Sequence, residues 1–352
     1  MTSKERVRAA IEHRQPDRVP VDIECLDDVW ESLMQHFGCS AQDDVLDKLE
    51  IDIRCVDYEN AYVGPELKRQ LLDNGEIVAD CYWGWKWRAY PNYKGKNLVF
   101  VAFDPPLDDA KTVDDVLAHR WPDPDWFDYD AIRQECRKYD DKAVIFGNAG
   151  VFQWGTFARN QEKLFAEMAM NPDIPRAIFD KCVEFELEFY DRVLTVADGA
   201  IDILKVADDF GTQKNAFFSP GMWRDFFAEN LRKLTDLAHR HGAYFMIHSC
   251  GAIRSLIPEL VACGVDILDP IQKLPGLEPE GLKREFGDRL TFHGGIDTQH
   301  LLPYGTPEAV AAETRHFVEV LNRDGGYILA ATVPLQADVP IENVLAMYAT
   351  RD

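Results

Sequence analysis

A histidine and a cysteine two residues apart form the pattern in this sequence with the most direct chemical meaning. The segment Tyr244-Phe-Met-Ile-His248-Ser-Cys250-Gly251 is an apolar run that ends in these two side chains. Successive side chains of a strand alternate between its faces, so His248 and Cys250 point the same way. An imidazole and a thiolate together suit Zn²⁺ better than a hard cation. The pattern predicts part of a metal site; a core histidine beside a buried cysteine is the alternative.

The elements that would position these residues alternate regularly between strand and helix. Apolar strand segments lie at residues 19–24 and 51–56, and six more follow from residue 142 onward, each with a helical segment after it. Eight strand–helix units predict an α/β fold, a (β/α)8 TIM barrel with a parallel sheet. An open doubly wound sheet is the main alternative, but no glycine-rich nucleotide-binding motif follows any strand. We expect a single domain over residues 1–352.

Polar residues gather where the predicted strands end, and in a barrel these ends meet at the face that carries the chemistry. Asp208, Asp209 and His293 are candidate catalytic acid–base groups there, with helix capping or solvation as the alternative for the aspartates. The residues that we predict to contact substrate are Trp154, Gln213, Asp297 and Gln336.

Residues 73–103 interrupt the strand–helix rhythm. Aromatic residues alternate there with polar ones, at Tyr82, Trp83, Trp85, Trp87, Tyr90 and Tyr93. With Asn92 and Gly95 as turn residues, the pattern predicts an inserted aromatic-rich β-hairpin. The hairpin would cover one end of the barrel, either as a lid over the substrate or as packing for its own domain.

The composition limits the class of protein. The 352 residues are 46% hydrophobic, which is enough for the core of one large barrel. The net charge of −23 opposes binding to nucleic acid or to an anionic membrane. No apolar run approaches the ~18 residues of a membrane span, and the N-terminus begins a charged helix rather than a signal peptide. The 8 cysteines include no C-x-x-C pair and indicate free thiols, so we expect a soluble, cytoplasmic protein.

Short segments spread over nearly the whole chain together resemble the uroporphyrinogen decarboxylase superfamily. They are Lys4-Glu-Arg-Val-Arg8 with Pro16-Asp-Arg-Val-Pro20, Gly211-Thr-Gln213, Ser219-Pro with Trp223, His248-Ser-Cys-Gly251, Gly264-Val-Asp-Ile-Leu268, Gly294-Gly-Ile-Asp-Thr-Gln299, and Gln336-Ala-Asp-Val-Pro340 with Glu342-Asn343. Within the superfamily, the chain is more similar to the branch of the corrinoid-linked methyltransferases. The resemblance implies a (β/α)8 barrel that is often dimeric, so a homodimer is expected.

The chain departs from the decarboxylases after the first strand. Their Arg-Gln-Ala-Gly-Arg segment grips the carboxylates of the substrate, whereas this chain has Glu24-Cys-Leu-Asp-Asp28. Acidic residues would repel an acidic porphyrinogen, so decarboxylation of uroporphyrinogen is not expected.

The second departure concerns the zinc ligands that the resemblance implies. His248 and Cys250 fall on two ligands of the thiol methyltransferases, but the third, a cysteine, aligns with Val333, which cannot bind a metal. We predict Glu24 as the replacement, since a carboxylate is an acceptable zinc ligand. Lesser candidates are Cys25, His293 and Asp208, and the alternative for Glu24 is a buried salt bridge to an arginine such as Arg54.

The resemblance and the His248–Cys250 pair together predict a zinc-dependent methyltransferase. It would move a methyl group between a small substrate, with a methoxylated aromatic compound as one candidate, and a corrinoid protein or a thiol. One barrel leaves no room for a cobalamin-binding domain, so a separate partner protein would carry the corrinoid. The alternatives are a metal-independent decarboxylase or lyase that uses Asp208 and His293, and a non-catalytic barrel that binds a tetrapyrrole or corrinoid.

Overall fold

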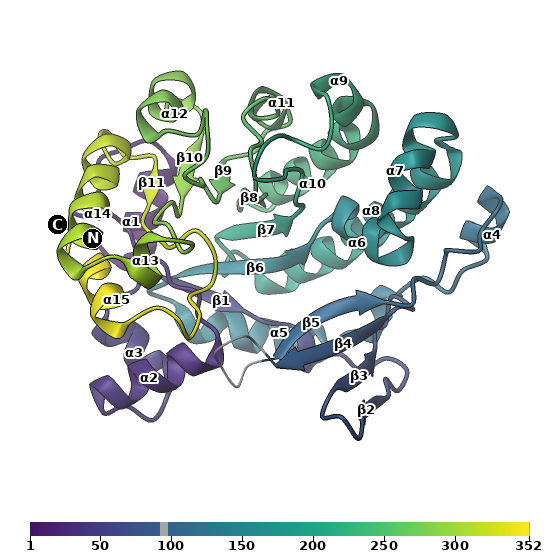
Figure 1. Cartoon of the computed structure of the whole chain (residues 1–352), viewed down its shortest axis with the longest axis horizontal. Helices are drawn as coiled ribbons and strands as arrows, with labels where there is room; N and C mark the ends of the chain where they lie inside the picture. The colour runs from purple at the N-terminus through teal and green to yellow at the C-terminus, as the bar shows by residue number, and fades with distance from the viewer. Residues whose placement is uncertain (92–97, 352) are drawn as a thin grey trace.

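The computed structural model describes residues 1–91 and 98–351 and is built around one curved sheet of 7 parallel strands (Figure 1). The strands lie side by side in the order β1-β6-β7-β8-β9-β10-β11. Their bounds are β1 Ile53–Val56, β6 Ala143–Ala149, β7 Ile203–Ala207, β8 Tyr244–His248, β9 Ile267–Asp269, β10 Thr291–His293 and β11 Tyr327–Ile328. Because every pair is parallel, the carboxyl ends of all these strands meet at one edge of the sheet.

Helices follow the strands and cover the outer, convex side of the sheet (Figure 1). The longer ones are α5 Tyr129–Cys136, α6 Val151–Ala158, α7 Gln161–Met170, α8 Asp173–Ala197, α10 Glu229–Arg240, α11 Ile257–Ala262, α12 Pro279–Phe286, α14 Pro307–Leu321 and α15 Ile341–Tyr348. Shorter ones are α4 Val113–Leu117, α9 Pro220–Trp223 and α13 Leu301–Tyr304. The parallel α/β architecture predicted from the alternation of strand and helix is therefore confirmed. No helix within the described ranges is long and apolar enough to cross a membrane.

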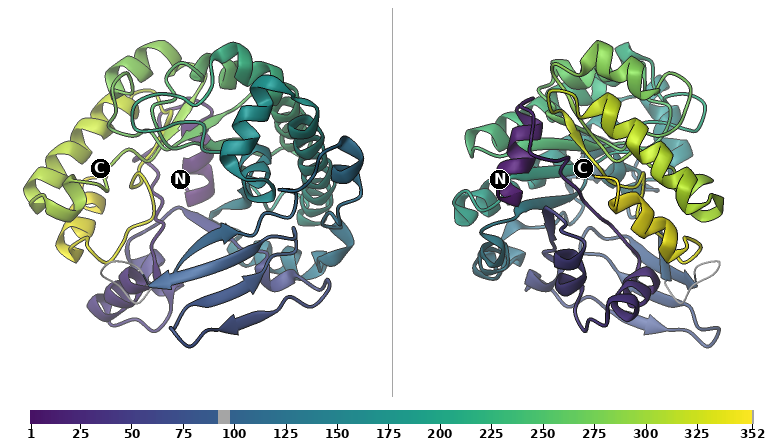
Figure 2. Two further views of the ribbon diagram at one scale, coloured as in Figure 1. Left: turned by 45° about the vertical axis from the view of Figure 1, so that its right-hand side comes forward. Right: turned by 90° about the vertical axis from the view of Figure 1, so that its left-hand side faces the viewer.

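The N-terminal helix α1 (Ser3–Ile11) closes the concave side of the sheet where the strands begin (Figure 2). Its Val7 and Ile11 pack in an apolar cluster with inward-facing residues of the strands. These partners are Ile53, Ala143, Ile145, Ile203, Met246, Ile267 and Ile328. The cluster fills the interior at the N-terminal ends of the strands, so only the carboxyl-terminal end is left to form a polar mouth.

The segment expected to be the first strand, residues 19–24, forms isolated bridges instead of a regular strand. Val21 pairs with Leu329, just beyond β11, and its carbonyl accepts the backbone N–H of Asp52, just before β1, at 3.0 Å. A second bridge joins Cys25 to Leu335. The segment therefore lies between β11 and β1, and helices α2 (Asp27–Phe37) and α3 (Gln42–Lys48) follow it. Pro20 has no N–H to donate, which limits regular pairing.

The insertion is a four-stranded antiparallel sheet, larger than the hairpin predicted for residues 73–103. Its strands are β2 Arg69–Leu71, β3 Ile77–Asp80, β4 Lys86–Pro91 and β5 Leu98–Phe103. The predicted turn, with Asn92, Tyr93 and Gly95, lies outside the described residues. Trp83 and Trp85 are buried and stack on Trp154 of α6, with ring centroids 4.9 and 5.6 Å away. These two indoles therefore anchor the insertion to the main body, which favours packing over a lid.

Candidate metal centre

The centre is built on the end of β8, where His248 is the last residue of the strand. Cys250 follows two residues later, and its Sγ lies 3.5 Å from Nε2 of His248. The chain then passes so close to the neighbouring loop that a Cβ on Gly251 would lie 2.5 Å from the carbonyl carbon of Gly211. Gly251 also has a φ of +97°, so a glycine is required there. The 3.5 Å distance between Sγ of Cys250 and Nε2 of His248 shows that the two side chains point the same way, as predicted.

Asp209 supplies a third group beside this pair. Its Oδ1 accepts the backbone N–H of Cys250 at 2.8 Å and lies 3.7 Å from Nε2 of His248. One ligand atom from each of the three residues lies within 4.8 Å of the other two. Ligands about 2.0–2.3 Å from a tetrahedral zinc ion lie roughly 3.3–3.8 Å apart, a range that includes the separations of Nε2 of His248 from Cys250 and from Asp209. All three side chains are partly exposed, which leaves one side open for a substrate.

The tautomer of His248 is fixed by Asp269, the last residue of β9. Nδ1 of His248 and Oδ2 of Asp269 are 2.7 Å apart, and a carboxylate can only accept here, so Nδ1 carries the proton. Nε2 therefore faces Cys250 and Asp209, which is the usual arrangement of a metal-binding histidine. Burial alone would lower the pKa of His248, but the charge and hydrogen bond of Asp269 outweigh it and raise the pKa to about 10.

Asp269 is also the centre of a wider charged network in the mouth of the sheet. Its Oδ1 accepts from Nδ1 of His293 at 2.7 Å, and Nε2 of His293 lies 3.0 Å from Asp22. Its Oδ2 also lies 3.3 Å from Nζ of Lys205, on β7. Burial would raise the pKa of Asp269, but the charges of Lys205, His293 and His248 hold it well below its usual range. His293 is buried as well, yet the Asp269 and Asp22 carboxylates raise its pKa to about 9.

The network lines a small cleft at the carboxyl ends of the strands, close to the candidate ligands. The cleft is formed by Asp22, Glu24, His248, Asp269, His293 and the loop of residues 330–334. Val333, which aligns with the missing third thiolate, is part of that loop and offers only an apolar wall.

Glu24 does not join His248 and Cys250 in the structure. Its Oε1 forms an ion pair with Nζ of Lys205 at 2.9 Å. Among the described residues, Asp209 is the carboxylate grouped with His248 and Cys250. The structure therefore places Asp209, and not Glu24, which we predicted as the third ligand, beside His248 and Cys250. The alternative of a buried salt bridge to an arginine is also wrong, because the Glu24 side chain is 41% exposed and pairs with a lysine, while Arg54 pairs with Asp47 at 2.6 Å.

Asp208 lies apart from the cleft although it neighbours Asp209 in sequence. Its Oδ1 accepts the backbone N–H of Gln153 at 2.8 Å, in the first turn of α6. Burial raises the pKa of Asp208 to about 7, although backbone hydrogen bonds from α6 oppose the rise. His293 bonds to Asp269 and Asp22, so the structure does not join Asp208 and His293 in one acid–base pair.

The residues predicted to contact substrate are scattered. Trp154 is 6% exposed and belongs to the indole stack under the insertion. Asp297 caps the turn before α13, where it accepts the backbone N–H groups of residues 299–301 at 2.8–3.2 Å. Gln213 and Gln336 are exposed in loops that follow β7 and β11, and their contact with substrate stays a prediction.

Sequence reasoning missed Lys205, the only cation within the named strand β7. The signal was present, because a single lysine interrupts the apolar run Ile203-Leu-Lys-Val-Ala207. A charged residue in a strand buried on both faces needs partners inside the protein. Its inward direction follows from its position two residues after Ile203, which packs in the interior cluster.

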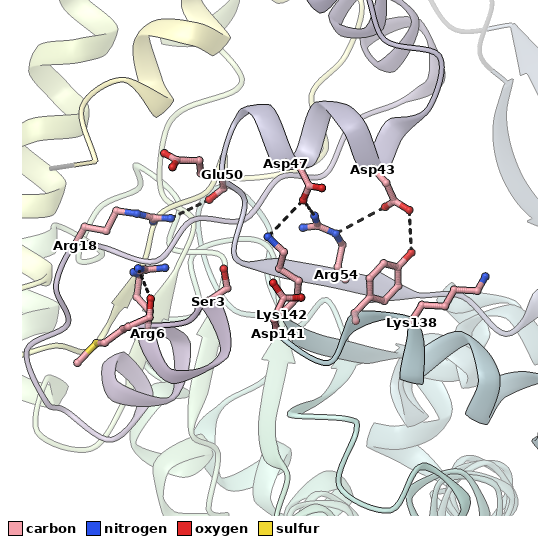
Figure 3. Close-up of a pocket in the computed structure, with 12 residues that line it drawn as sticks. Ser3, Arg6, Arg18, Asp43, Asp47, Glu50, Arg54, Lys138, Asp141 and Lys142 are labelled. Carbon is pink, nitrogen blue, oxygen red and sulfur yellow. Dashed lines mark hydrogen bonds and ion pairs between the residues drawn. The ribbon is translucent and has the colours of Figure 1, made fainter.

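A second polar groove lies at the opposite end of the sheet, and its charges are mutually compensated (Figure 3). Asp47 pairs there with Arg54 at 2.6 Å and with Lys142 at 3.4 Å, while Arg18 donates to the carbonyl of Glu50 at 3.0 Å. The N-terminal ends of barrel strands usually serve stability. We therefore assign the functional site to the carboxyl-terminal end.

The chain was compared with models of known protein families. The family model of uroporphyrinogen decarboxylase (URO-D) matches residues 105–352. This chain therefore belongs to the uroporphyrinogen decarboxylase family, and the resemblance read from the short sequence segments is confirmed. A comparison with curated proteins found no match.

Solved structures share the fold at low sequence identity. A methyltransferase from Methanosarcina mazei is 19% identical, with a TM-score of 0.70, and the match covers 100% of this chain and 98% of that one. A D-psicose 3-epimerase from Clostridium cellulolyticum H10 is 12% identical, with a TM-score of 0.41, over 64% of this chain and 83% of that one. The first match extends the fold similarity over the whole chain; the second is too distant to support an argument.

Proposed function

We propose that this protein is a zinc-dependent methyltransferase, with His248, Cys250 and Asp209 as the metal ligands. The observation that carries the proposal is the convergence of these side chains at the end of β8, with His248 oriented by Asp269. A bound zinc ion would supply Lewis acidity, which can polarise a methoxy oxygen or stabilise a thiolate. The ligand set of one imidazole, one thiolate and one carboxylate suits zinc and leaves a position for the reacting group.

The remaining residues of the mouth define what this chain does around that centre. Asp269 keeps the proton on Nδ1 of His248, so that Nε2 is the atom offered to the metal. Asp22 pairs with His293 and Glu24 with Lys205, so the acidic residues of the cleft are compensated by these cations. The cleft therefore suits a neutral substrate better than a polycarboxylate such as uroporphyrinogen. The apolar side chain of Val333 in the same cleft gives a methyl-bearing group a dry surface.

The family membership and the fold shared with the M. mazei methyltransferase support this class of enzyme. We further propose that residues 19–25 complete an eight-stranded barrel between β11 and β1. Val21 accepts the backbone N–H of Asp52, just before β1, and its neighbours Pro20 and Asp22 hydrogen bond with Leu329, just beyond β11. The methyl acceptor or donor would be a corrinoid on a separate protein, or a thiol. A homodimer and a cytoplasmic location remain part of the proposal.

The test compares the purified protein with two cysteine variants. Cys250→Ala removes a proposed ligand, whereas Cys39→Ala changes a partly exposed cysteine just beyond the end of α2, outside the group of candidate ligands. We expect zinc affinity and methyl transfer to a reduced corrinoid protein to fall by more than about 100-fold in Cys250→Ala, because loss of an outer partner alone costs about 10–100-fold. Cys39→Ala should behave as the wild type. A folded wild-type protein with no affinity for zinc, or a fully active Cys250→Ala variant, would refute the proposal.

A further inference from the structure

We propose that Lys205 and His293 are positioning residues that act on the metal centre through Asp269. Neither belongs to the group of Asp209, His248 and Cys250 in the structure. Each donates to Asp269, and Asp269 in turn holds His248. The inference rests on the proposed zinc function and adds the reason why the metal would find His248 already oriented.

The two oxygens of Asp269 are held from opposite sides. Oδ1 accepts from Nδ1 of His293 at 2.7 Å, while Oδ2 accepts from Nδ1 of His248 at 2.7 Å and lies 3.3 Å from Lys205. A carboxylate that is bonded at both oxygens cannot rotate without breaking one of these bonds. The plane of Asp269 is therefore fixed, and with it the direction in which Nε2 of His248 points.

The two donors are themselves tethered by acidic residues. Lys205 lies 2.9 Å from Oε1 of Glu24, and Nε2 of His293 lies 3.0 Å from Oδ2 of Asp22. The network thus runs from the segment before α2 through β7, β9 and β10 to His248 on β8. It ties five separate parts of the chain to one imidazole.

Burial makes the network rigid. The side chains of Asp269 and His293 are each 5% exposed, and that of Lys205 is 17% exposed. Water has little access to replace a lost donor, so an interaction removed here is not readily compensated. The exposed ion pairs elsewhere on the surface lack this property.

The direction in which zinc affinity changes when Lys205 is replaced distinguishes a positioning role from a purely electrostatic one. Lys205 is a cation close to a site for a cation, so removal of its charge alone should tighten metal binding. If Lys205 instead holds Asp269 in place, its removal should weaken metal binding. Loss of a partner of this kind typically costs about 10–100-fold in metal affinity.

The experiment measures zinc affinity by competition with a chelator, and the visible absorption of the Co²⁺-substituted protein, which reports the ligand geometry. We expect Lys205→Met to bind zinc at least ~10-fold more weakly and to show an altered Co²⁺ spectrum. Lys205→Arg keeps a cationic donor and should regain part of the affinity. Lys181→Met, which removes a lysine from a surface ion pair on α8, is the matched control and should bind as the wild type.

A double variant shows whether the effect passes through Asp269. In an Asp269→Asn background, Lys205→Met should cause no further loss of affinity, because energies of residues in one network do not add. Asp22→Asn weakens the hold on His293 and also removes a negative charge near the site, so both effects should weaken binding, and the sign test rests on Lys205→Met. Unchanged or tighter zinc binding in Lys205→Met and Asp22→Asn would overturn the inference, whereas a wild type without zinc affinity would overturn the proposed function itself.

Discussion

At the scale of single residues, Nε2 of His248 is the atom at which a proton and the proposed zinc ion would compete. The neighbouring Asp269 holds the proton on Nδ1 and stabilises a second proton on Nε2, so the imidazole is charged when no metal is bound. A metal ligand must be deprotonated, and binding therefore releases this proton. The same carboxylate that orients His248 for zinc also makes the free site sensitive to pH.

This competition predicts a pH dependence of zinc binding. The pKa of His248 is raised to about 10, so between pH 6 and pH 8 the ion must displace the proton from Nε2. Zinc affinity should rise by at least about tenfold per pH unit over this range. Calorimetry in buffers with different enthalpies of ionisation would count the protons released. Binding without any release of protons would contradict the assigned role of His248.

The buried carboxyl group of Glu186 tests the electrostatics of the protein interior away from the candidate metal centre. Glu186, on α8, is 1% exposed, and burial together with the charge of Asp208 raises its pKa well above the usual range. The folded state therefore binds a proton that the unfolded state releases above pH ~4.3. The contribution of this carboxyl to stability is complete below that pH and is lost as the pH rises toward its folded pKa.

Glu186→Gln should remove this dependence. Relative to the wild type, the free energy of unfolding of the variant should increase by up to about 1.4 kcal/mol for each pH unit above ~4.3. Urea unfolding at pH 5 and pH 8 measures the difference, and Glu184→Gln, which changes a largely exposed residue of the same helix, is the control. A variant that is equally or more destabilised at pH 8 than at pH 5 would show that the carboxylate is ionised and paired in the folded state.

At the scale of elements, the insertion is held by its aromatic residues. Trp83 is 1% exposed and packs against both Trp85 and Trp154, with ring centroids 5.8 and 4.9 Å away. The sheet β2–β5 thus has a hydrophobic attachment to α6, and α6 begins beside the carboxyl end of β7. The insertion is therefore attached to a helix whose first turn lies at the carboxyl-terminal edge of the sheet, the edge that carries the candidate site.

Removal of one of these indoles should loosen the attachment. Trp83→Ala should lower the free energy of unfolding by about 3–5 kcal/mol, since it leaves a large cavity in a dry stack. Phe100→Ala, on β5 of the same insertion, removes a ring that is 49% exposed and should cost less than about 1 kcal/mol. Chemical denaturation with tryptophan fluorescence and circular dichroism measures both. Equal effects of the two substitutions would contradict the packing described here.

The elements were predictable to different degrees for physical reasons. Strand–helix alternation is a local property of the sequence, and it predicted the parallel sheet. The segment at residues 19–24 reads as a strand, but Pro20 and its position between β11 and β1 leave only isolated bridges. In the insertion, the aromatic alternation marked β4, whereas β2 lies in a polar stretch with no such signal.

At the scale of the whole molecule, the candidate site depends on which strands are neighbours. The shared direction of His248 and Cys250 follows from the period of one strand and was predictable. The choice of Asp209 over Glu24 depends on the register of β7 against β8 and on the partner that Lys205 selects, and neither is visible in a single sequence. Family resemblance was detectable from short local segments, and two of them, residues 248–251 and 294–299, lie at the carboxyl ends of β8 and β10.

The most direct test of the central claim is the zinc X-ray absorption spectrum of the wild-type protein loaded with one equivalent of zinc. We predict one sulfur ligand at about 2.3 Å, with the remaining ligands nitrogen or oxygen at about 2.0–2.2 Å. The sulfur contribution should vanish in Cys250→Ala. A spectrum with oxygen ligands alone, or sulfur that persists in Cys250→Ala, would contradict a metal centre at His248, Cys250 and Asp209.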